Sequence, residues 1–321
     1  MKFQNLILIV ISFIVLGCQS EKANEPKPLK ASTEGVELVV LGTVQDGGAP
    51  HIGCKKACCE RLWKNPDESL KVVSLGVIDH DNDKVYIFEA TPDFPEQIAH
   101  LNRLAGRKMD QMPDGIFITH AHIGHYTGLM FLGREAKGAK EVPVYVMPQM
   151  QYFLNSNGPW DQLVNLENIA LKSLSDTAAL DLPGGIEVTP FRVPHRDEYS
   201  ETVGFIIAGQ KKKTMFIPDI DKWSKWEEDI VGKMSEVDVA FLDATFYDGE
   251  EINNRDIAEI PHPFVIESMA LFDNLPANEK AKVRFIHLNH TNPLLDEESE
   301  AYKKVVSKGY KVANFGNRSS I

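Results

Sequence analysis

Ile118-Thr119-His120-Ala121-His122-Ile123-Gly124-His125 is the most telling stretch of this 321-residue chain, because three of its ten histidines fall within six residues. Residues two apart in an extended segment point to the same side, so His120 and His122 can bind one ion. Gly124 allows a turn after which His125 can face the same cavity from another direction. The segment therefore predicts a metal site.

Four apolar, strand-like runs end directly at a residue type that binds metals. The carboxyl ends of strands in an α/β sheet gather at one edge, where ligands commonly bind. A lone histidine is more often structural than a ligand, but four such strand ends together indicate one site. These residues are His120 after residues 116–119, His195 after 186–193, Asp219 after 214–217 and His287 after 283–286.

Strand-like and helical patterns alternate from residue 36 onward, without a short repeat or a long linker. The simplest arrangement is a single α/β domain in which helices pack on two central sheets. The predicted strands are 36–41, 72–78, 84–89, 115–119, 142–147, 186–193, 202–208, 214–217, 237–242 and 283–286, and the predicted helices are 92–104, 126–136, 263–271 and 297–307.

The composition is that of an ordinary globular protein, with 43% hydrophobic and 25% charged residues. The net charge of −12 argues against a polyanionic partner, because nucleic-acid binders usually present basic surface. We therefore expect a small-molecule substrate and no nucleic acid.

The first 18 residues have the pattern of a signal peptide. An apolar run from Leu6 to Leu16 is too short to span a bilayer, which needs about 20 residues, but suits a secretory signal. Val15-Leu16-Gly17-Cys18 resembles the processing box of bacterial lipoproteins, in which the cysteine is acylated; a plain secretory signal or a weak anchor is the alternative. Residues 19–35 predict a flexible tether. We expect an exported, membrane-anchored lipoprotein with its main domain at 36–321.

The other three cysteines form the cluster Cys54, Cys58 and Cys59. An exported compartment favours disulfides, but three cysteines cannot all pair within one chain, and adjacent cysteines bridge only with strain. A zinc site of thiolates is the alternative, and it lacks a fourth ligand. The segment alone does not decide between them.

Taken together, the histidine segment and the strand-end residues resemble the metallo-β-lactamase superfamily. The resemblance runs from residue 36 to the C-terminus and implies an αββα sandwich. The opening segment 41–59 and the late segment 285–293 are most similar to the branch that contains the pyrroloquinoline quinone biosynthesis protein B and the phosphodiesterases of phosphonate breakdown.

The resemblance implies two metal sites. His120, His122 and His195 would bind the first ion and Asp219 would bridge to a second, which His125 and His287 complete. The family's motif is His-x-His-x-Asp-His, and Gly124 stands where its Asp does, so the second site loses a carboxylate. Zinc is the expected ion, with manganese or iron as alternatives. Asp243, after another strand, is a candidate to orient a ligand histidine.

The same branch implies a structural zinc held by three cysteines and a later histidine. That histidine is His290 here, so Cys54, Cys58, Cys59 and His290 would form a closed tetrahedral site. The relatives have the spacing Cys-x-Cys-x2-Cys, whereas Lys56 takes the middle position in this chain and Cys58 is additional.

The resemblance favours a metal-dependent hydrolase acting on a small phosphodiester or related ester through an activated water. Asp219 and His262 are the catalytic candidates, with His262 as the proton donor to the leaving group or, alternatively, as a residue of the loop that caps the next helix. An iron-dependent redox or cofactor-maturation enzyme is the second hypothesis, and a non-catalytic metal-binding protein is the third.

Overall fold

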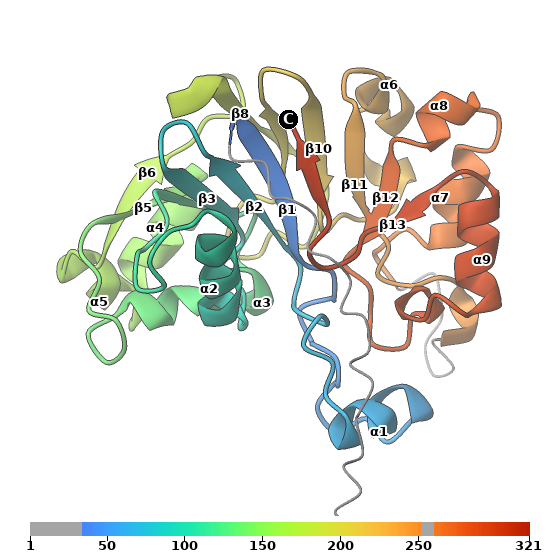
Figure 1. Ribbon diagram of the computed structural model, residues 1–321, viewed down its shortest axis with the longest axis horizontal. Coiled ribbons are helices and arrows are strands. Elements are labelled where there is room, and N and C mark those ends of the chain that lie inside the picture. The colour runs from blue at the N-terminus through green and yellow to red at the C-terminus, as the bar shows by residue number, and fades with distance from the viewer. Residues whose placement is uncertain (1–33, 252–259) are drawn as a thin grey trace, which may run out of the picture. The chain divides into compact units, whose positions relative to one another are not determined.

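The strands form two seven-stranded sheets in residues 34–251 and 260–321, the part of the chain that the computed structural model describes (Figure 1). The predictions for the signal peptide, Cys18 and nearly all of the tether concern residues 1–33, which lie outside this part. Among the described residues, no helix has the length and apolar character required to cross a membrane.

The first sheet has the order β14-β1-β2-β3-β4-β5-β6. Its β14, β1, β2 and β3 pair antiparallel, whereas β3, β4, β5 and β6 run parallel. Its strands are β1 (Val36–Gly42), β2 (Ser74–Asp79), β3 (Lys84–Phe88), β4 (Gly115–Phe117), β5 (Val142–Val146), β6 (Ile169–Ser173) and β14 (Arg318–Ser320).

The second sheet, ordered β13-β12-β11-β10-β9-β8-β7, repeats this plan. An antiparallel half leads into a parallel half that begins at β10. Its strands are β7 (Leu180–Leu182), β8 (Ile186–Arg192), β9 (Val203–Ala208), β10 (Lys213–Ile217), β11 (Val239–Asp243), β12 (Val283–Ile286) and β13 (Lys311–Val312).

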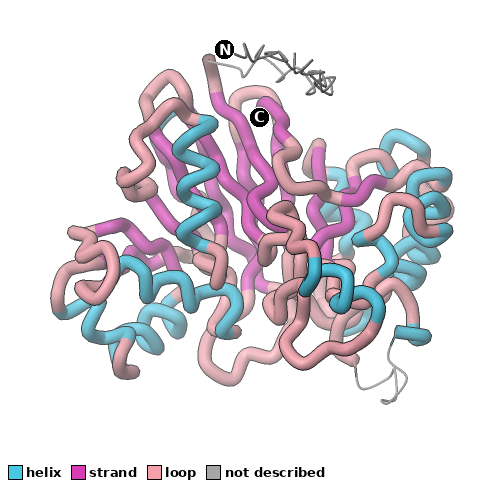
Figure 2. Tube along the Cα trace, turned by 60° about the horizontal axis from the view of Figure 1, so that its bottom comes forward, coloured by secondary structure: helices cyan, strands magenta, loops and turns pink. Residues whose placement is uncertain are grey.

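Helices cover the outer face of each sheet, as Figure 2 shows. Those of the first half are α2 (Phe94–Leu104), α3 (Ile123–Tyr126), α4 (Pro148–Ser156) and α5 (Trp160–Asn165), and those of the second half are α6 (Ile230–Ser235), α7 (Val265–Leu271), α8 (Ala277–Lys280) and α9 (Glu300–Ser307). The remaining helix, α1 (Ala57–Lys64), lies on the long connection between β1 and β2, away from both sheets in Figure 1.

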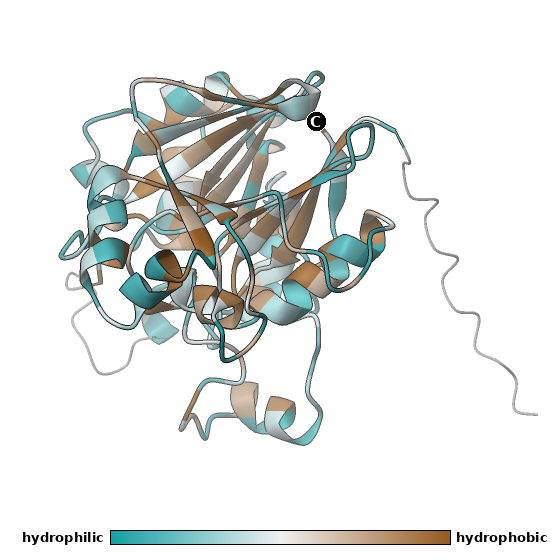
Figure 3. Cartoon of the chain, turned by 90° about the vertical axis from the view of Figure 1, so that its left-hand side faces the viewer, coloured by the Kyte–Doolittle hydropathy of each residue, from teal (hydrophilic) through white to brown (hydrophobic). Residues whose placement is uncertain are grey.

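Three hydrophobic cores hold the layers together. The central core joins the facing sides of the sheets, with Phe88 and Phe117 of the first against Phe205 of the second. A second core fills the space between the first sheet and α2 to α5, and a third lies between the second sheet and α6, α7 and α9. Strands that are buried on both faces read as continuous apolar runs, which Figure 3 shows as brown strands inside helices with teal outer faces. The predicted αββα sandwich is confirmed.

One predicted helix, 126–136, is wrong. The α-helix begins at Ile123 and ends at Tyr126, and the chain continues as a 3₁₀-helix over Thr127–Leu132. Gly128 packs so closely on the preceding loop that a Cβ there would lie 2.3 Å from the Thr91 carbonyl oxygen. Glycine is also a poor helix former, so close packing decides the local conformation.

Candidate metal centre

The parallel halves of the two sheets bring the ends of their strands together. His120 and His122 follow β4, and His125 lies in the short α3. Asp219 follows β10, and His287 follows β12. His195, in the loop between β8 and β9, completes the predicted set.

The first group of candidate ligands consists of His120, His122, His195 and Asp219, whose ligand atoms lie within 4.8 Å of one another. The Asp219 carboxylate is central: its Oδ2 lies 3.5 Å from His120 Nε2, and its Oδ1 lies 3.2 Å from His195 Nε2. This is the set that the resemblance implied for the first ion.

The second group differs from the expected one, because it consists of Asp219, Asp243, His262 and His287, again within 4.8 Å of one another. His125 lies between the two groups: its Nε2 is 3.7 Å from Asp219 Oδ2, and its ring centroid is 4.3 Å from that of His120 and 5.5 Å from that of His287. Asp219 therefore belongs to both groups.

Several candidate ligand atoms, in these groups and in His125 between them, are buried and have no hydrogen-bond partner. Buried polar atoms in proteins are nearly always hydrogen-bonded, so a convergent set of unpaired atoms needs an explanation. Nitrogen lone pairs beside a carboxylate are what a divalent ion such as zinc binds, and the residues therefore fit a metal. The unpaired atoms are the Nε2 atoms of His120, His125, His195 and His287 and Oδ1 of Asp219.

Outer partners direct the imidazoles towards the centre. Thr119 Oγ1 lies 2.8 Å from Nδ1 of His120, and Thr245 Oγ1 lies 2.8 Å from Nδ1 of His287. His195 uses its Nδ1 in the same way, 3.2 Å from Asp221 Oδ1. A partner on Nδ1 fixes the ring and leaves Nε2 for the ion, as at known zinc sites.

His262 and Asp243 form a buried pair beside this centre. His262 Nδ1 is 2.8 Å from Asp243 Oδ2 and 3.1 Å from Asp219 Oδ1. Burial alone would lower the pKa of His262, but the charges of Asp243 and Asp219 raise it to about 10. Burial alone would raise the pKa of Asp243, but His262 and His287 lower it to about 2. Phe264, and not His262, is the N-cap of α7. The His262 ring instead contacts the carboxylates of Asp243 and Asp219.

Glu89 is a site residue that the sequence reasoning missed. It is fully buried, follows β3, and lies with Oε2 3.7 Å from His125 Nδ1. Both Glu89 (φ 78°) and His287 (φ 65°) adopt left-handed backbone conformations, which are strained for such residues and cluster at functional sites. His120 and Asp219 were predicted because they directly follow apolar strands. Glu89, at the end of a predicted strand, could have been found by the same pattern.

The structure brings Cys54, Cys58, Cys59 and His290 together, with ligand atoms within 4.8 Å of one another. The three thiols are free, and Sγ of Cys58 is 4.0 Å from that of each of the other two. Burial raises the pKa of Cys59 to about 12, and burial together with the charges of His51 and Lys56 lowers the pKa of His290 to about 4. His290 is therefore neutral at pH 7, the form that binds metals.

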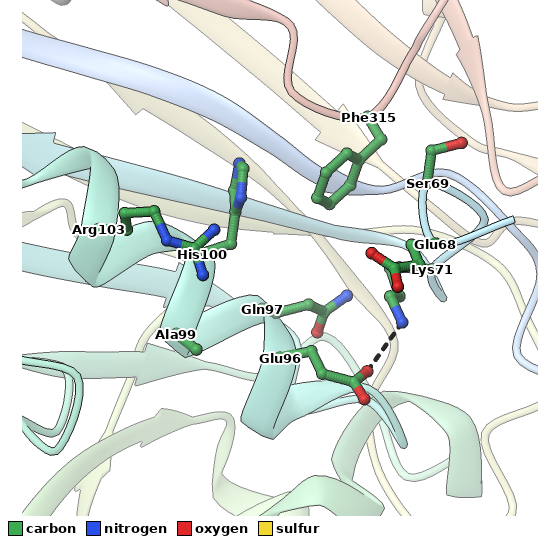
Figure 4. Close-up of a pocket in the computed structure, with 9 residues that line it drawn as sticks. All are labelled: Glu68, Ser69, Lys71, Glu96, Gln97, Ala99, His100, Arg103 and Phe315. Carbon is green, nitrogen blue, oxygen red and sulfur yellow. Dashed lines mark hydrogen bonds and ion pairs between the residues drawn. The ribbon is translucent and has the colours of Figure 1, made fainter. Parts of the chain in front are cut away.

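Two cavities differ in their position relative to these groups of candidate ligands. One, of about 650 Å³, is lined by α2 and the loop before β2 and contains the Lys71–Glu96 ion pair (Figure 4). No candidate metal ligand lines this cavity. A second, of about 450 Å³, is lined by Tyr152, Tyr199 and Glu198 among others, and Glu198 Oε2 lies 3.9 Å from His122 Nε2. That cavity adjoins the metal centre.

Comparison with known proteins agrees with the fold. Residues 85–288 match the family model described as Beta-lactamase superfamily domain. Coenzyme PQQ synthesis protein B of Methylobacterium sp. (strain 4-46) is 24% identical over 307 residues, which cover 88% of this chain and 98% of the relative.

Two solved structures have the same fold. Zn²⁺-bound PqqB from Methylobacterium extorquens aligns with a TM-score of 0.71 and 20% identity, covering 89% of this chain and 100% of that one. A diphosphatase from the PhnP family aligns with a TM-score of 0.59 and 21% identity, covering 88% and 96%. The predicted likeness to these two groups of proteins is confirmed.

Proposed function

Because the chain belongs to the beta-lactamase superfamily, we propose that it is a metal-dependent hydrolase of a small phosphodiester or related ester. The observation that carries this proposal is the set of buried, unpaired histidine nitrogens around Asp219. His120, His122 and His195 would hold one ion, His125 and His287 the other, and Asp219 would contact both. Bound divalent ions supply Lewis-acid polarisation of a phosphoryl or carbonyl oxygen and activate water at neutral pH.

The protein's own groups provide the proton transfer. His262 is held between the carboxylates of Asp243 and Asp219, which raise its pKa and keep it protonated. A protonated imidazole can donate to the oxygen of a leaving group. Thr245 Oγ1 donates to Asp243 Oδ1 at 2.7 Å and fixes this carboxylate.

The cavity next to the centre supports a substrate with a planar group. Tyr152 and Tyr199 are 72% and 65% exposed there, so their rings are accessible to a ligand. Aromatic faces stack on planar groups. The net charge of −12 disfavours highly charged anions, and a phosphodiester carries a single charge. These features together favour an aryl or nucleoside diester over a phosphomonoester.

The test is hydrolysis by purified protein loaded with zinc or manganese. We expect bis(p-nitrophenyl) phosphate to be cleaved faster than p-nitrophenyl phosphate, and the Asp219→Asn variant to lose at least about 100-fold in kcat. Asp110→Asn, at an exposed position away from the centre, is the matched control. Stoichiometric metal without cleavage of any diester or carboxylic ester would refute the proposal.

The similarity to coenzyme PQQ synthesis protein B favours a second candidate, an iron-dependent enzyme of cofactor maturation. Histidines with a carboxylate also suit iron. Iron in protein purified without oxygen, together with oxygen consumption on a quinone precursor and no ester cleavage, would select this candidate over the hydrolase.

We propose further that the protein is exported and anchored through acylated Cys18. The support is the sequence of residues 6–18. Radiolabelled palmitate should enter the wild-type chain but not a Cys18→Ser variant, and the variant should move from the membrane fraction to the soluble fraction. Equal labelling of both chains would count against the anchor.

A further inference from the structure

Gly124 has no room for a side chain, and the space that one would fill is taken by Asp46. An ideal Cβ on Gly124 would lie 1.9 Å from Asp46 Cβ, 2.9 Å from its Cα and 3.0 Å from its Cγ. Real Cβ atoms do not approach other atoms this closely. The carboxymethyl group of Asp46 therefore stands where the side chain of residue 124 would otherwise stand.

The loop after β1 holds Asp46 in this place. The Gln45 N–H donates to the Leu288 carbonyl at 2.9 Å, and the Leu288 N–H donates to the Thr43 carbonyl at 2.8 Å, which ties the loop to the residue after His287. The Gly48 N–H donates to the Gln45 carbonyl at 2.8 Å and closes a turn with Asp46 at its second position. The backbone at Asp46 is thus held on both sides.

Asp46 also lies beside Gly124, the residue that directly precedes the candidate ligand His125. It is half-buried, whereas the neighbouring His125 is fully buried, and its negative charge acts on that imidazole. Asp46 is outside the two groups of candidate ligands whose ligand atoms lie within 4.8 Å of one another. Its short side chain must therefore rotate before its carboxylate can bind an ion there. Rotation about χ1 and χ2 is available to a side chain on a loop.

We propose that Asp46 supplies, from the loop after β1, the carboxylate that position 124 lacks, and that it binds the divalent ion held beside His125. This inference rests on the proposed two-ion hydrolase. It assigns a ligand that is remote in sequence from the histidine segment. It also means that only one of positions 46 and 124 can carry the carboxylate, because a side chain at position 124 needs the space that Asp46 occupies.

The first experiment counts ions in the full chain. Wild type, Asp46→Asn and the Asp110→Asn control are titrated with zinc or manganese, and bound metal is measured by elemental analysis and calorimetry. We expect Asp46→Asn to bind the second ion of the histidine centre at least about tenfold more weakly while its thermal unfolding without metal stays close to that of the control. Equal affinity in Asp46→Asn and Asp110→Asn would overturn the inference.

The second experiment moves the carboxylate. Asp46→Gly should lose the second ion. Gly124→Asp should unfold at a lower temperature because of the 1.9 Å contact. The double variant, Asp46→Gly with Gly124→Asp, should recover both the stability and the second ion. A double variant no better than Asp46→Gly would refute the exchange. A wild-type centre that binds one ion would refute the two-ion proposal itself, whereas two ions bound with equal affinity in wild type and Asp46→Asn would refute only the role of Asp46.

Discussion

The substitution Glu89→Gln should remove part of the pH dependence of folding stability in the metal-free protein. Glu89 and His125 are both 0% exposed, and their charged atoms lie 3.7 Å apart. Burial alone would lower the pKa of His125, but Glu89, with Asp219 and Asp46, raises it to about 9. The unfolded chain has an ordinary histidine pKa of about 6.5, so the native state binds an extra proton between these values.

The size and sign of the effect follow from proton linkage. A raised native pKa stabilises the fold fully below about pH 6.5, and this stabilisation is lost as the pH rises through about 9. At about 1.4 kcal/mol per pKa unit, the change is about 3 kcal/mol. In Glu89→Gln the principal source of the raised pKa is gone, so burial keeps His125 neutral and most of this pH-dependent contribution disappears.

Urea unfolding, followed by tryptophan fluorescence in the presence of a chelator, tests this prediction by measuring the free energy of unfolding. The free energy of unfolding should fall between pH 6 and pH 9.5 by about 3 kcal/mol more in wild type than in Glu89→Gln, with similar m-values. Contributions from His195 and His262, whose pKa values are also raised, are common to both proteins and cancel in the difference. Parallel stability curves for the two proteins would show that Glu89 does not control His125.

Four other outcomes are expected. Thr245→Val, which removes the partner of His287 Nδ1, should weaken metal binding about 10–100-fold, measured by competition with a chromophoric chelator; unchanged affinity would exclude an orienting role. His262→Asn should lower kcat about 10²–10⁴-fold and abolish the fall in rate at the alkaline pH where His262 deprotonates. If the pH–rate profile of the variant still falls at alkaline pH, that fall belongs to another group. Cys59→Ser and His290→Ala should each lose one zinc per chain by elemental analysis. A free-thiol assay that finds fewer than three thiols in unfolded, metal-free protein consisting of residues 19–321 would instead support a disulfide. Removing all metal should lower the free energy of unfolding by about 2.7 kcal/mol for a site held at 100 times its Kd, and thermal unfolding with and without chelator tests this.

The sequence was sufficient for the parts of the fold that depend on local patterns. Apolar runs predicted β1, β3, β10 and β12 because strands buried on both faces carry continuous apolar residues. The short strands β7 and β14 were not predicted, since Arg318-Ser319-Ser320 has no apolar pattern and is extended only because it pairs with β1. Tertiary pairing, not local preference, makes these residues a strand.

The candidate metal centre could likewise be predicted only in part. His120, His195, Asp219 and His287 could be found because they end apolar strands at one sheet edge. Asp46 could not be found in this way, because its proximity to Gly124 joins segments 78 positions apart through a loop whose course the sequence does not determine.

The pairing of β1 with β14 has a consequence for how the chain reaches its native state. Glu37 is opposite Ser320 and is ion-paired with Arg318, which is 281 positions away in the sequence. Contacts of such long range form late and slow the folding of a domain. Until residues 318–320 dock, β1 presents an open edge of buried, apolar sequence, and such edges pair readily with other chains. Deletion of the last four residues should therefore promote aggregation during refolding, even though these residues are remote from the metal centre.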